Sequence, residues 1–493
     1  MRTSEAVYAN LREFVEFLRK RGELVEITTS VDPKLEIAEI ADRCVKSASG
    51  GPALLFTDVR GSKMPVLINA VATRARMEAA LGVATLDQLG DKIRDLLKML
   101  QPGGSKLGML FELKDLAGIF PKSVRSGPCQ EEVFEGDAVD LRALPVLTCW
   151  PNDGGPFITL PLVFTKHPTT GTQNVGMYRM QIYDRNTTGM HWQRHKHGRE
   201  HQDSSLRDAR MPVAVAIGTD PAVTYAATAP LPPNVDEMLM AGFLRGKAVP
   251  MVDCKTVDVK VPADAEIVLE GYVDNSELRV EGPFGDHTGV YTPREPFPVF
   301  HVTCLTRRHS PIYWTTIVGK PPMEDAWLGK ATERLFLPLL QQMLPEVVDY
   351  NLPVEGGFHN LVIVSVKKRY PGQAKKVMYA LWGLGHMMML TRNIIVVDAD
   401  VDVQDVREVA WTTLNNVDAG RDLVFAPGPV DHLDHAGPLP LLGTRLGIDA
   451  TRKGPEEGYT REWPEEMVMS KEVKESVARR WREYGLAEFV DIG

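Results

Sequence analysis

The densest group of reactive side chains in the sequence is a run of histidines. Four of the twelve histidines fall within eleven residues, and they are His191, His195, His197 and His201. A strand would place all four on one face, because they share parity, whereas a helix would pair His191 with His195 and His197 with His201. Imidazoles in either geometry are suited to binding a transition metal. The spacing is equally compatible with an exposed polar rim.

A second candidate is the segment from Asn174 to Arg179, which reads Asn-Val-Gly-Met-Tyr-Arg. An arginine on a strand can hold a carboxylate or a phosphate through two parallel hydrogen bonds. Gly176 would let a ligand come close to the backbone. In a regular strand Asn174 and Arg179 face opposite sides, so one site uses both only where the strand bends or the ligand wraps around its end. A strand with an ordinary surface arginine is the alternative.

A third candidate is the turn Glu281-Gly-Pro-Phe-Gly-Asp286-His287, in which two carboxylates bracket a tight bend. Two carboxylates that lie close together push their pKa values apart, so that one of them can hold a proton near neutral pH. Such a group is suited to general acid catalysis. A solvated turn with acidic ends is the alternative interpretation.

Glu237 stands near the start of a helix that we expect over residues 235–245. It follows Asn234, the expected N-cap, by three residues, which is the spacing of a capping box. The same carboxylate is also a suitable hard oxygen ligand for a divalent metal. The local pattern allows both roles.

Several motifs of nucleotide and hydrolase chemistry do not occur in the sequence. No Gly-x-Gly-x-x-Gly opens a helix, and there is neither a Walker A sequence nor a Gly-x-Ser-x-Gly elbow. The usual nucleotide fingerprints and the nucleophile turn of the α/β-hydrolases are therefore absent. The run Met387-Met388-Met389 falls on an expected helix, and we interpret it as core filling rather than as a cofactor site.

The elements that must position these residues fall into three stretches of different texture. Up to about residue 125 helices and strands alternate, with helices expected over 11–18, 35–45, 74–81 and 85–100 and strands over 25–27, 53–56 and 66–68. Short β-rich runs with many turns follow, which favour a sandwich or a barrel: 158–165, 174–183, 212–217, 265–273, 299–305 and 312–318. After about residue 325 the alternation returns, with helices over 328–343, 373–390, 403–414 and 471–484 and strands over 361–366 and 393–397.

The composition is that of a large globular protein with several domains. The chain has 493 residues, of which 44% are hydrophobic and 25% are charged. A net charge of -9 argues against binding to nucleic acid. No apolar run approaches the roughly 18 residues of a transmembrane segment, and the first residues do not resemble a signal peptide. Five scattered cysteines indicate a reducing compartment, so we expect a cytoplasmic protein.

Taken in order, these motifs resemble those of the UbiD family of non-oxidative decarboxylases, which use prenylated FMN. The matching pieces are Asn174-x-Gly-x-Tyr-Arg179, then His195, then Glu237 ahead of Ala-Gly-Phe-Leu-Arg-Gly, then Glu281-Gly-Pro-Phe-Gly-Asp286-His. The likeness runs from Val31-Asp32-Pro33 to Gly447-Ile448-Asp449-Ala450-Thr451 and so covers nearly the whole chain.

The resemblance implies a set of metal and cofactor ligands. Asn174, His195 and Glu237 correspond to the ligands of a divalent metal, usually Mn²⁺, that joins the protein to the flavin phosphate, with K⁺ or Na⁺ close by. His191, His197 and His201 do not match the ligand position and are expected at the surface. The residues expected around prenylated FMN are Asn174, Gly176, Met177, Tyr178, Arg179, Arg194, His195 and Glu237.

The resemblance also implies a catalytic trio of Arg179, Glu281 and Asp286. Arg179 would pair with Glu281 and orient the substrate carboxylate against the flavin. Asp286 would donate the proton that replaces carbon dioxide. Many members of the family have glutamate at the last position, and this sequence follows the aspartate branch.

The fold implied by the resemblance is of the α/β (α+β) class. It has an N-terminal α/β domain over 1–124, a central split β-barrel over 125–322 that binds the flavin and the metal, and a C-terminal α/β oligomerisation domain over 323–470. The last helix, within 471–493, would be exchanged with a partner subunit. The expected assembly is a homodimer or a homohexamer.

Within the family, the sequence is most similar to the branch that serves menaquinone biosynthesis. The similar segments are 188–193, 222–232 and 356–360. The substrate implied is an acid of the 1,4-dihydroxy-6-naphthoate type, and the alternatives are 4-hydroxy-3-polyprenylbenzoate of ubiquinone biosynthesis or another aryl or acrylic acid. A flavin prenyltransferase would supply the cofactor. Outside this class, a metal-dependent hydrolase and a non-catalytic flavin-binding protein remain as interpretations of the same residues.

Overall fold

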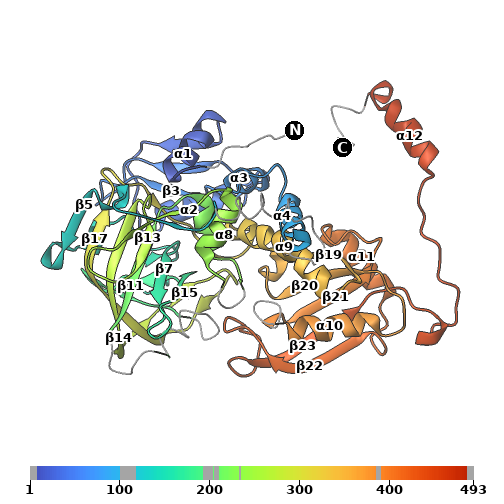
Figure 1. Ribbon diagram of the computed structural model, residues 1–493. Coiled ribbons are helices and arrows are strands. Elements are labelled where there is room, and N and C mark those ends of the chain that lie inside the picture. The colour runs from blue at the N-terminus through green and yellow to red at the C-terminus, as the bar shows by residue number, and fades with distance from the viewer. Residues whose placement is uncertain are drawn as a thin grey trace.

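The computed structural model describes residues 8–99, 118–192, 204, 210–231, 235–384 and 390–485. Within them lie an N-terminal region, a β-rich central region and a C-terminal region, which pack together apart from the last helix (Figure 1). The mixed α/β class predicted from the sequence is confirmed. No helix of the described residues is long and apolar enough to cross a membrane.

The N-terminal region is a small sheet covered by helices. Helix α1 (Leu11–Lys20) begins after Asn10, whose side chain accepts a hydrogen bond from the Glu13 N–H, and its buried residues recur at helical spacing. The strands lie in the order β1-β2-β3-β18, so the sheet is completed by a strand from much later in the chain. The elements are β1 (Leu24–Ile27), α2 (Glu36–Val45), β2 (Ala53–Phe56), β3 (Val66–Ile68), α3 (Arg74–Ala80), α4 (Asp87–Met99) and β18 (Tyr313–Trp314).

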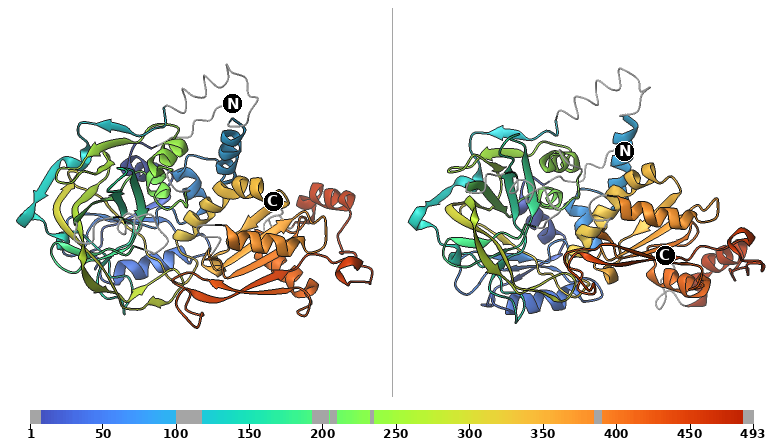
Figure 2. Two further views of the ribbon diagram at one scale, coloured as in Figure 1. Left: turned by 60° about the horizontal axis from the view of Figure 1, so that its bottom comes forward. Right: turned by 90° about the horizontal axis from the view of Figure 1, so that it is seen from below.

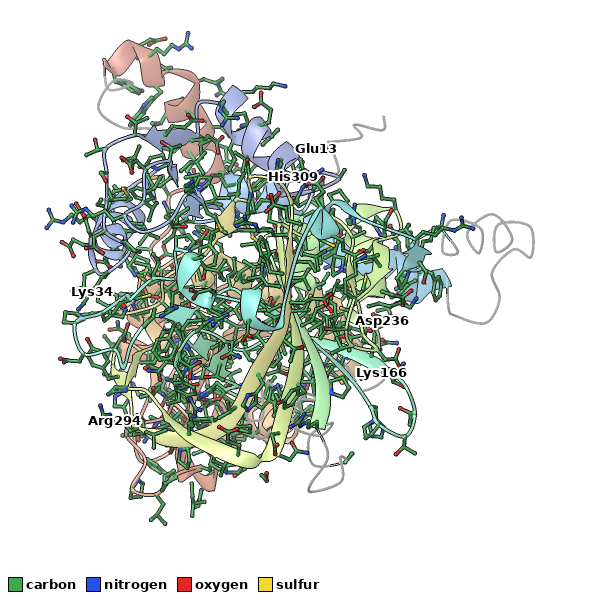
Figure 3. All side chains as sticks on the ribbon, turned by 90° about the vertical axis from the view of Figure 1, so that its left-hand side faces the viewer. Glu13, Lys34, Lys166, Asp236, Arg294 and His309 are labelled. Carbon is green, nitrogen blue, oxygen red and sulfur yellow. The ribbon has the colours of Figure 1, made fainter. Side chains whose placement is uncertain are left out.

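The central region is built on an antiparallel sheet of seven strands. Their order is β10-β17-β14-β11-β7-β8, with β5 also paired to β17. Among the described residues no pairing links β8 to β10, so the sheet stays open there. Figure 3 views this side of the molecule and labels Lys166 at the end of β7. The strands are β5 (Glu132–Glu135), β7 (Leu162–Lys166), β8 (Gln173–Met177), β10 (Thr187–Gly189), β11 (Arg210–Ile217), β14 (Ile267–Glu281) and β17 (Glu295–Arg307).

Short elements surround this sheet, and the candidate site residues that the structure describes lie on them, on β8 and β14 of the sheet, or in the segments that join the two. Two of the short elements are two-stranded ribbons, β6 with β9 and β15 with β16. The third is a three-stranded sheet in the order β13-β12-β4. The elements are β4 (Lys122–Val124), β6 (Phe157–Ile158), β9 (Met180–Gln181), α7 (Pro221–Ala226), α8 (Glu237–Arg245), β12 (Pro250–Asp253), β13 (Lys260–Pro262), β15 (Phe284–Gly285) and β16 (Tyr291–Thr292).

The C-terminal region is a five-stranded sheet with helices packed on it (Figure 2). The strand order is β19-β20-β21-β23-β22, and the central strands β20, β21 and β23 are parallel, with β20 buried along most of its length. Helix α12 stands away from this body at the end of an extended segment (Figure 1). The elements are α9 (Asp325–Met343), β19 (Val347–Asn351), β20 (Leu361–Val366), α10 (Gln373–Gly383), β21 (Asn393–Asp398), α11 (Val406–Asn416), β22 (Leu423–Pro429), β23 (Leu442–Asp449) and α12 (Lys471–Arg479).

Five of the elements expected from the sequence differ in the structure. The strand expected over 158–165 is split into β6 and β7, and the helix expected over 471–484 ends at Arg479. The strand expected over 174–183 is broken into β8 and β9, and that expected over 312–318 is reduced to β18. The helix expected over 373–390 ends at Gly383, and Met387-Met388-Met389 lie outside the described residues. Helix α8 is capped by Asp236, whose side chain accepts a hydrogen bond from the Met238 N–H, and Asn234, the expected cap, also lies outside them.

Candidate active site

A cavity of about 310 Å³ lies where the central and C-terminal regions meet. Its wall is built from the end of β8 and the residues after it, the segment between α7 and α8, the β15–β16 ribbon and the first turns of α9. This volume is in the range of small-molecule and cofactor sites. The sequence-predicted residues that line it are Asn174, Gly176, Met177, Tyr178, Arg179, Glu237 and Asp286.

The break between β8 and β9 brings Asn174 and Arg179 to the same cavity. Tyr178 folds back over Gly176, and a Cβ added at Gly176 would lie 2.5 Å from the Tyr178 ring. Only glycine leaves room for this fold-back, which ends the regular strand before Arg179. For the two side chains to share a site, either the strand had to bend or the ligand had to wrap around its end, and the structure has a bend at this position.

Arg179 is held by hydrogen bonds in three directions. Its Nε donates to Glu281 Oε1 at 3.0 Å, its Nη1 donates to Asp286 Oδ2, and its Nη2 donates to Thr292 Oγ1 at 3.1 Å. The guanidinium also lies over the ring of Phe284, 4.7 Å from the centroid. The turn that separates the two carboxylates therefore brings both of them to one arginine.

Glu281 lies behind Arg179 rather than in the wall of the cavity. Glu281 is 1% exposed, and its Oε1 accepts hydrogen bonds from Arg179 Nε and, at 2.9 Å, from His191 Nδ1. Burial acts to raise the pKa of Glu281, but the His191 hydrogen bond and the Arg179 charge outweigh it, so the pKa is lowered. Glu281 is thus a buried carboxylate that anchors the guanidinium.

His191 is a part of this cluster that the sequence argument placed wrongly at the surface. It is 4% exposed, and its ring packs against Phe297 at 4.2 Å between centroids. Burial and the nearby Arg179 charge lower the pKa of His191, which makes it a neutral donor to Glu281. The flanking residues Met190 and Trp192 are also buried, and this apolar context was the available signal.

Asp286 is an anionic group held from both sides. Its Oδ1 accepts from the backbone N–H of His287 at 2.7 Å and lies 2.8 Å from His287 Nδ1, while Oδ2 contacts Arg179. Burial acts to raise the pKa of Asp286, but the His287 hydrogen bond and the Arg179 charge prevail and hold it well below its usual range. In this arrangement Asp286 is a carboxylate, so it must be loaded with a proton before it acts as an acid.

Asn174 and Glu237 offer two hard oxygen donors to the same cavity. Both are buried, at 8% and 5% exposed, and Glu237 Oε2 accepts from the Val175 N–H at 3.2 Å. Since Asp236 caps α8, Glu237 is not needed as the cap. An amide oxygen and a carboxylate fit a divalent cation of the Mn²⁺ or Mg²⁺ kind. His195 and Arg194, like His197 and His201, lie outside the described residues.

Models of three domains of one family match the chain in order. Residues 15–94 match the N-terminal domain of 3-octaprenyl-4-hydroxybenzoate carboxy-lyase, residues 122–321 its Rift-related domain and residues 326–450 its C-terminal domain. An uncharacterised protein of Archaeoglobus fulgidus is 53% identical over 481 residues, which cover 97% of this chain and 98% of the relative. An uncharacterised protein of Aquifex aeolicus is 50% identical over 483 residues, with 97% and 99% covered.

Solved structures of the same class have a similar fold. The UbiD-class enzyme HmfF of Pelotomaculum thermopropionicum, in complex with FMN, matches with a TM-score of 0.78 and 29% identity over 92% of this chain and 97% of that one. The vanillic acid decarboxylase of Sedimentibacter hydroxybenzoicus, in its closed form, matches with a TM-score of 0.83 and 28% identity over 97% and 99%. The chain therefore belongs to the UbiD family and is a carboxy-lyase of that class.

Proposed function

We propose that this protein catalyses the reversible, non-oxidative decarboxylation of a phenolic aromatic acid with prenylated FMN as cofactor. The observation that carries the proposal is Arg179, held between Glu281 and Asp286 at a cavity that Asn174 and Glu237 also line. Structures of HmfF in complex with FMN and with prenylated FMN support the choice of cofactor.

In this proposal Asn174, Glu237 and His195 would hold Mn²⁺ or another divalent metal, which would neutralise the charge of the flavin phosphate. Gly176, Met177, Tyr178 and Arg194 would bind the cofactor, and Ala227 and Thr228, which line the same cavity, would help bind K⁺ or Na⁺. Prenylated FMN, when bound, would supply the electron sink that an aryl carboxylate lacks.

The residues of the chain would bind the acid, exclude water and move one proton. Arg179 pairs with the substrate carboxylate and is kept in place by Glu281. As the substrate takes up hydrogen bonds of Arg179, Asp286 loses part of its cationic partner, and its pKa rises. Because the carboxylate leaves as neutral carbon dioxide, the carbon that lost it must gain one proton, and Asp286 delivers it.

Within this class we propose an acid of the 1,4-dihydroxy-6-naphthoate type, in menaquinone biosynthesis, as the substrate. The alternative is 4-hydroxy-3-polyprenylbenzoate of ubiquinone biosynthesis. The similarity to a vanillic acid decarboxylase at 28% identity supports a phenolic acid in general.

The test is to measure carbon dioxide release from 1,4-dihydroxy-6-naphthoate, 4-hydroxy-3-prenylbenzoate and vanillate in parallel. The protein is co-produced with a flavin prenyltransferase, and Asp286→Asn is the control. Turnover of the naphthoate alone, lost in the variant, supports the menaquinone assignment. Turnover of another of the acids moves the substrate to that acid. No turnover of any of them, in protein whose absorbance shows prenylated FMN, contradicts the phenolic assignment.

The same proposal includes assembly through the C-terminal segment. None of the residues of α12 is buried, and the segment before it exposes large apolar side chains, with Met467 fully exposed. Val473 and Val477, one helical turn apart on α12, are also exposed. Such a face is covered by a second copy of the chain in the proposed homodimer or homohexamer.

A further inference from the structure

A row of titratable side chains leads from the cavity into the C-terminal region. Asp286 Oδ1 lies 2.8 Å from His287 Nδ1, and His287 Nε2 lies 3.3 Å from His359 Nδ1. His359 Nε2 lies 3.9 Å from Asp431 Oδ1, and the Asp431 side chain is 26% exposed. The row thus connects a buried carboxylate at the cavity with one that solvent reaches.

The hydrogen-bond partners fix where the protons lie in this row. His359 Nδ1 is 2.8 Å from the Gly357 carbonyl, which can only accept, so His359 Nδ1 carries a hydrogen. That hydrogen also faces His287 Nε2, which is therefore the acceptor. His287 then carries its proton on Nδ1 and donates it to Asp286.

In the site described above His287 only holds Asp286, and His359 has no role there. His287 belongs to the β15–β16 ribbon, and its ring stacks on Phe358 of the C-terminal region at 5.1 Å and 17°. His359 Nε2 is buried and has no hydrogen-bond partner among the described residues. A buried polar atom without a partner is costly, which argues that His359 is retained for a function.

We infer that His287 and His359 form a proton relay that reloads Asp286 in each turnover from the side of Asp431. The inference rests on the proposed function, because that reaction consumes one proton from Asp286 for each carbon dioxide released. In this relay His287 and His359 act on the substrate only through Asp286. They are therefore positioning residues rather than groups that touch the substrate.

The steps of the relay balance without any other reactant. His287 breaks its Nδ1–H bond as the Asp286 Oδ1–H bond forms, and His287 Nε2 takes the Nδ1 proton of His359. His359 Nε2 gains a proton that enters from solvent by way of Asp431. The gap of 3.9 Å at Asp431 is longer than a hydrogen bond, and a rotation of this partly exposed carboxylate shortens it. Each ring then loses the proton on Nε2 and regains one on Nδ1 through solvent, which restores the starting tautomers with no net change in the number of protons.

The charged groups around the two rings favour an added proton on His287 over one on His359. Four titratable groups among the described residues face His287. Asp286 lies on the same ribbon, and His359 follows η4 (Val354–Gly356). Asp325 stands at the start of α9, and Asp431 follows β22. Burial acts to lower the pKa of His287, but Asp286 outweighs it and the pKa is raised. Burial and the His287 charge lower the pKa of His359. Burial raises the pKa of Asp325 to about 7, so Asp325 is a further group that titrates here.

The first test compares His287→Gln and His359→Gln with the parent enzyme on the acid that it turns over. We expect kcat to fall about ten- to a hundredfold, with KM within about twofold, and a shifted pH profile of kcat. Imidazole in the buffer should restore part of the activity of His287→Ala and none of that of Asp286→Asn. The control is His301→Gln, since His301 pairs with Glu277 away from the cavity and should behave as the parent.

The second test needs no substrate and follows the histidine titrations by NMR of protein labelled in the imidazole rings. The signals of His287 and His359 are assigned from their loss in the two variants. We expect His359→Gln to raise the pKa of His287 and His301→Gln to leave it unchanged. Identical titration of His287 in the parent and in His359→Gln would overturn the relay.

The two tests separate the relay from the proposed function. If the parent releases carbon dioxide and His287→Gln has the parent's kcat and pH profile, the relay is wrong and the function stands. If the parent acts on none of the acids although the two titrations are coupled, the coupling between His287 and His359 stands and the proposed function fails.

Discussion

Arg179 links two carboxylates that come from the two ends of one turn. Glu281 is buried and Asp286 faces the cavity, so the same guanidinium neutralises one charge in the interior and one at the site. Removing one partner of a buried charged group leaves the other uncompensated, and this costs more than the pair contributes. Loss of activity and loss of stability are therefore coupled at this residue.

Arg179→Lys tests this coupling, because a lysine cannot reach both carboxylates and Thr292 at once. We expect kcat/KM to fall at least about a hundredfold and the free energy of unfolding to fall by roughly 2–4 kcal/mol. Steady-state kinetics and urea unfolding measure the two effects. Arg142→Lys, at an exposed arginine, should change neither. A stable and active Arg179→Lys enzyme would contradict the role given to the guanidinium.

Glu281 predicts a specific dependence of stability on pH. The pKa of Glu281 is lower in the folded protein than in the unfolded chain, where it is near 4.5. The contribution of Glu281 to the free energy of unfolding is therefore fully present above about pH 4.5 and is lost as pH falls through the folded pKa. We expect the free energy of unfolding of Glu281→Gln to be lower than that of the parent at pH 7 and to fall less steeply below about pH 4.5. Urea unfolding between pH 7 and pH 3.5 measures both, and the exposed Glu475→Gln should follow the parent.

Among the elements, the break between β8 and β9 decides which side chains meet. Helix α1 could be predicted from its apolar spacing, and strands β2 and β3 from short continuous apolar runs, which are buried at every residue. The residue types of the candidate site could also be predicted, since Arg179 stands on an expected strand and Glu281 and Asp286 bracket an expected turn. The position of the break could not, because it depends on the Tyr178 ring meeting Gly176. The burial of His191 could not be predicted either, because it depends on the pairing of β10 with β17, which are far apart in the sequence.

Gly176→Ala should disturb the site through the backbone rather than through lost chemistry. An added Cβ would lie 2.5 Å from Tyr178, so the ring must move out of its place beside the cavity. We expect a loss of roughly 1–3 kcal/mol of stability, as for other overpacked positions, and about tenfold weaker binding of FMN. Thermal unfolding and a fluorescence titration with FMN in the presence of Mn²⁺ measure these. Gly383→Ala is the matched control, because a Cβ at Gly383 meets nothing within 4 Å.

At the scale of the whole molecule, catalytic and structural contacts both cross between regions. His287 of the central region meets Phe358 and His359 of the C-terminal region, so the relay is complete only when the two are packed together. Helix α12 in contrast makes few contacts with its own chain and exposes apolar residues. An exposed helix with apolar residues at the end of an extended segment is suited to docking on a neighbouring subunit.

Val473→Asp with Val477→Asp tests the assembly without removing the arm. Two charges on the apolar face of α12 should reduce the oligomer to a smaller species, because burying unpaired carboxylates is costly. Light scattering coupled to size-exclusion chromatography gives the mass. Lys474→Glu, which also adds acidic charge on α12, should leave the mass of the parent assembly unchanged. An unchanged mass in the double variant would exclude α12 as the docking element.

The pairing of β18 with β3 has a consequence for biosynthesis. Tyr313 lies opposite Val66 in a parallel pair, so the N-terminal sheet lacks its last strand until nearly 250 further residues have been made. At roughly 5–20 residues per second this leaves the edge of β3 unpaired on the ribosome for about 12 to 50 seconds. An open strand edge of this kind is a template for wrong pairing until β18 has been made.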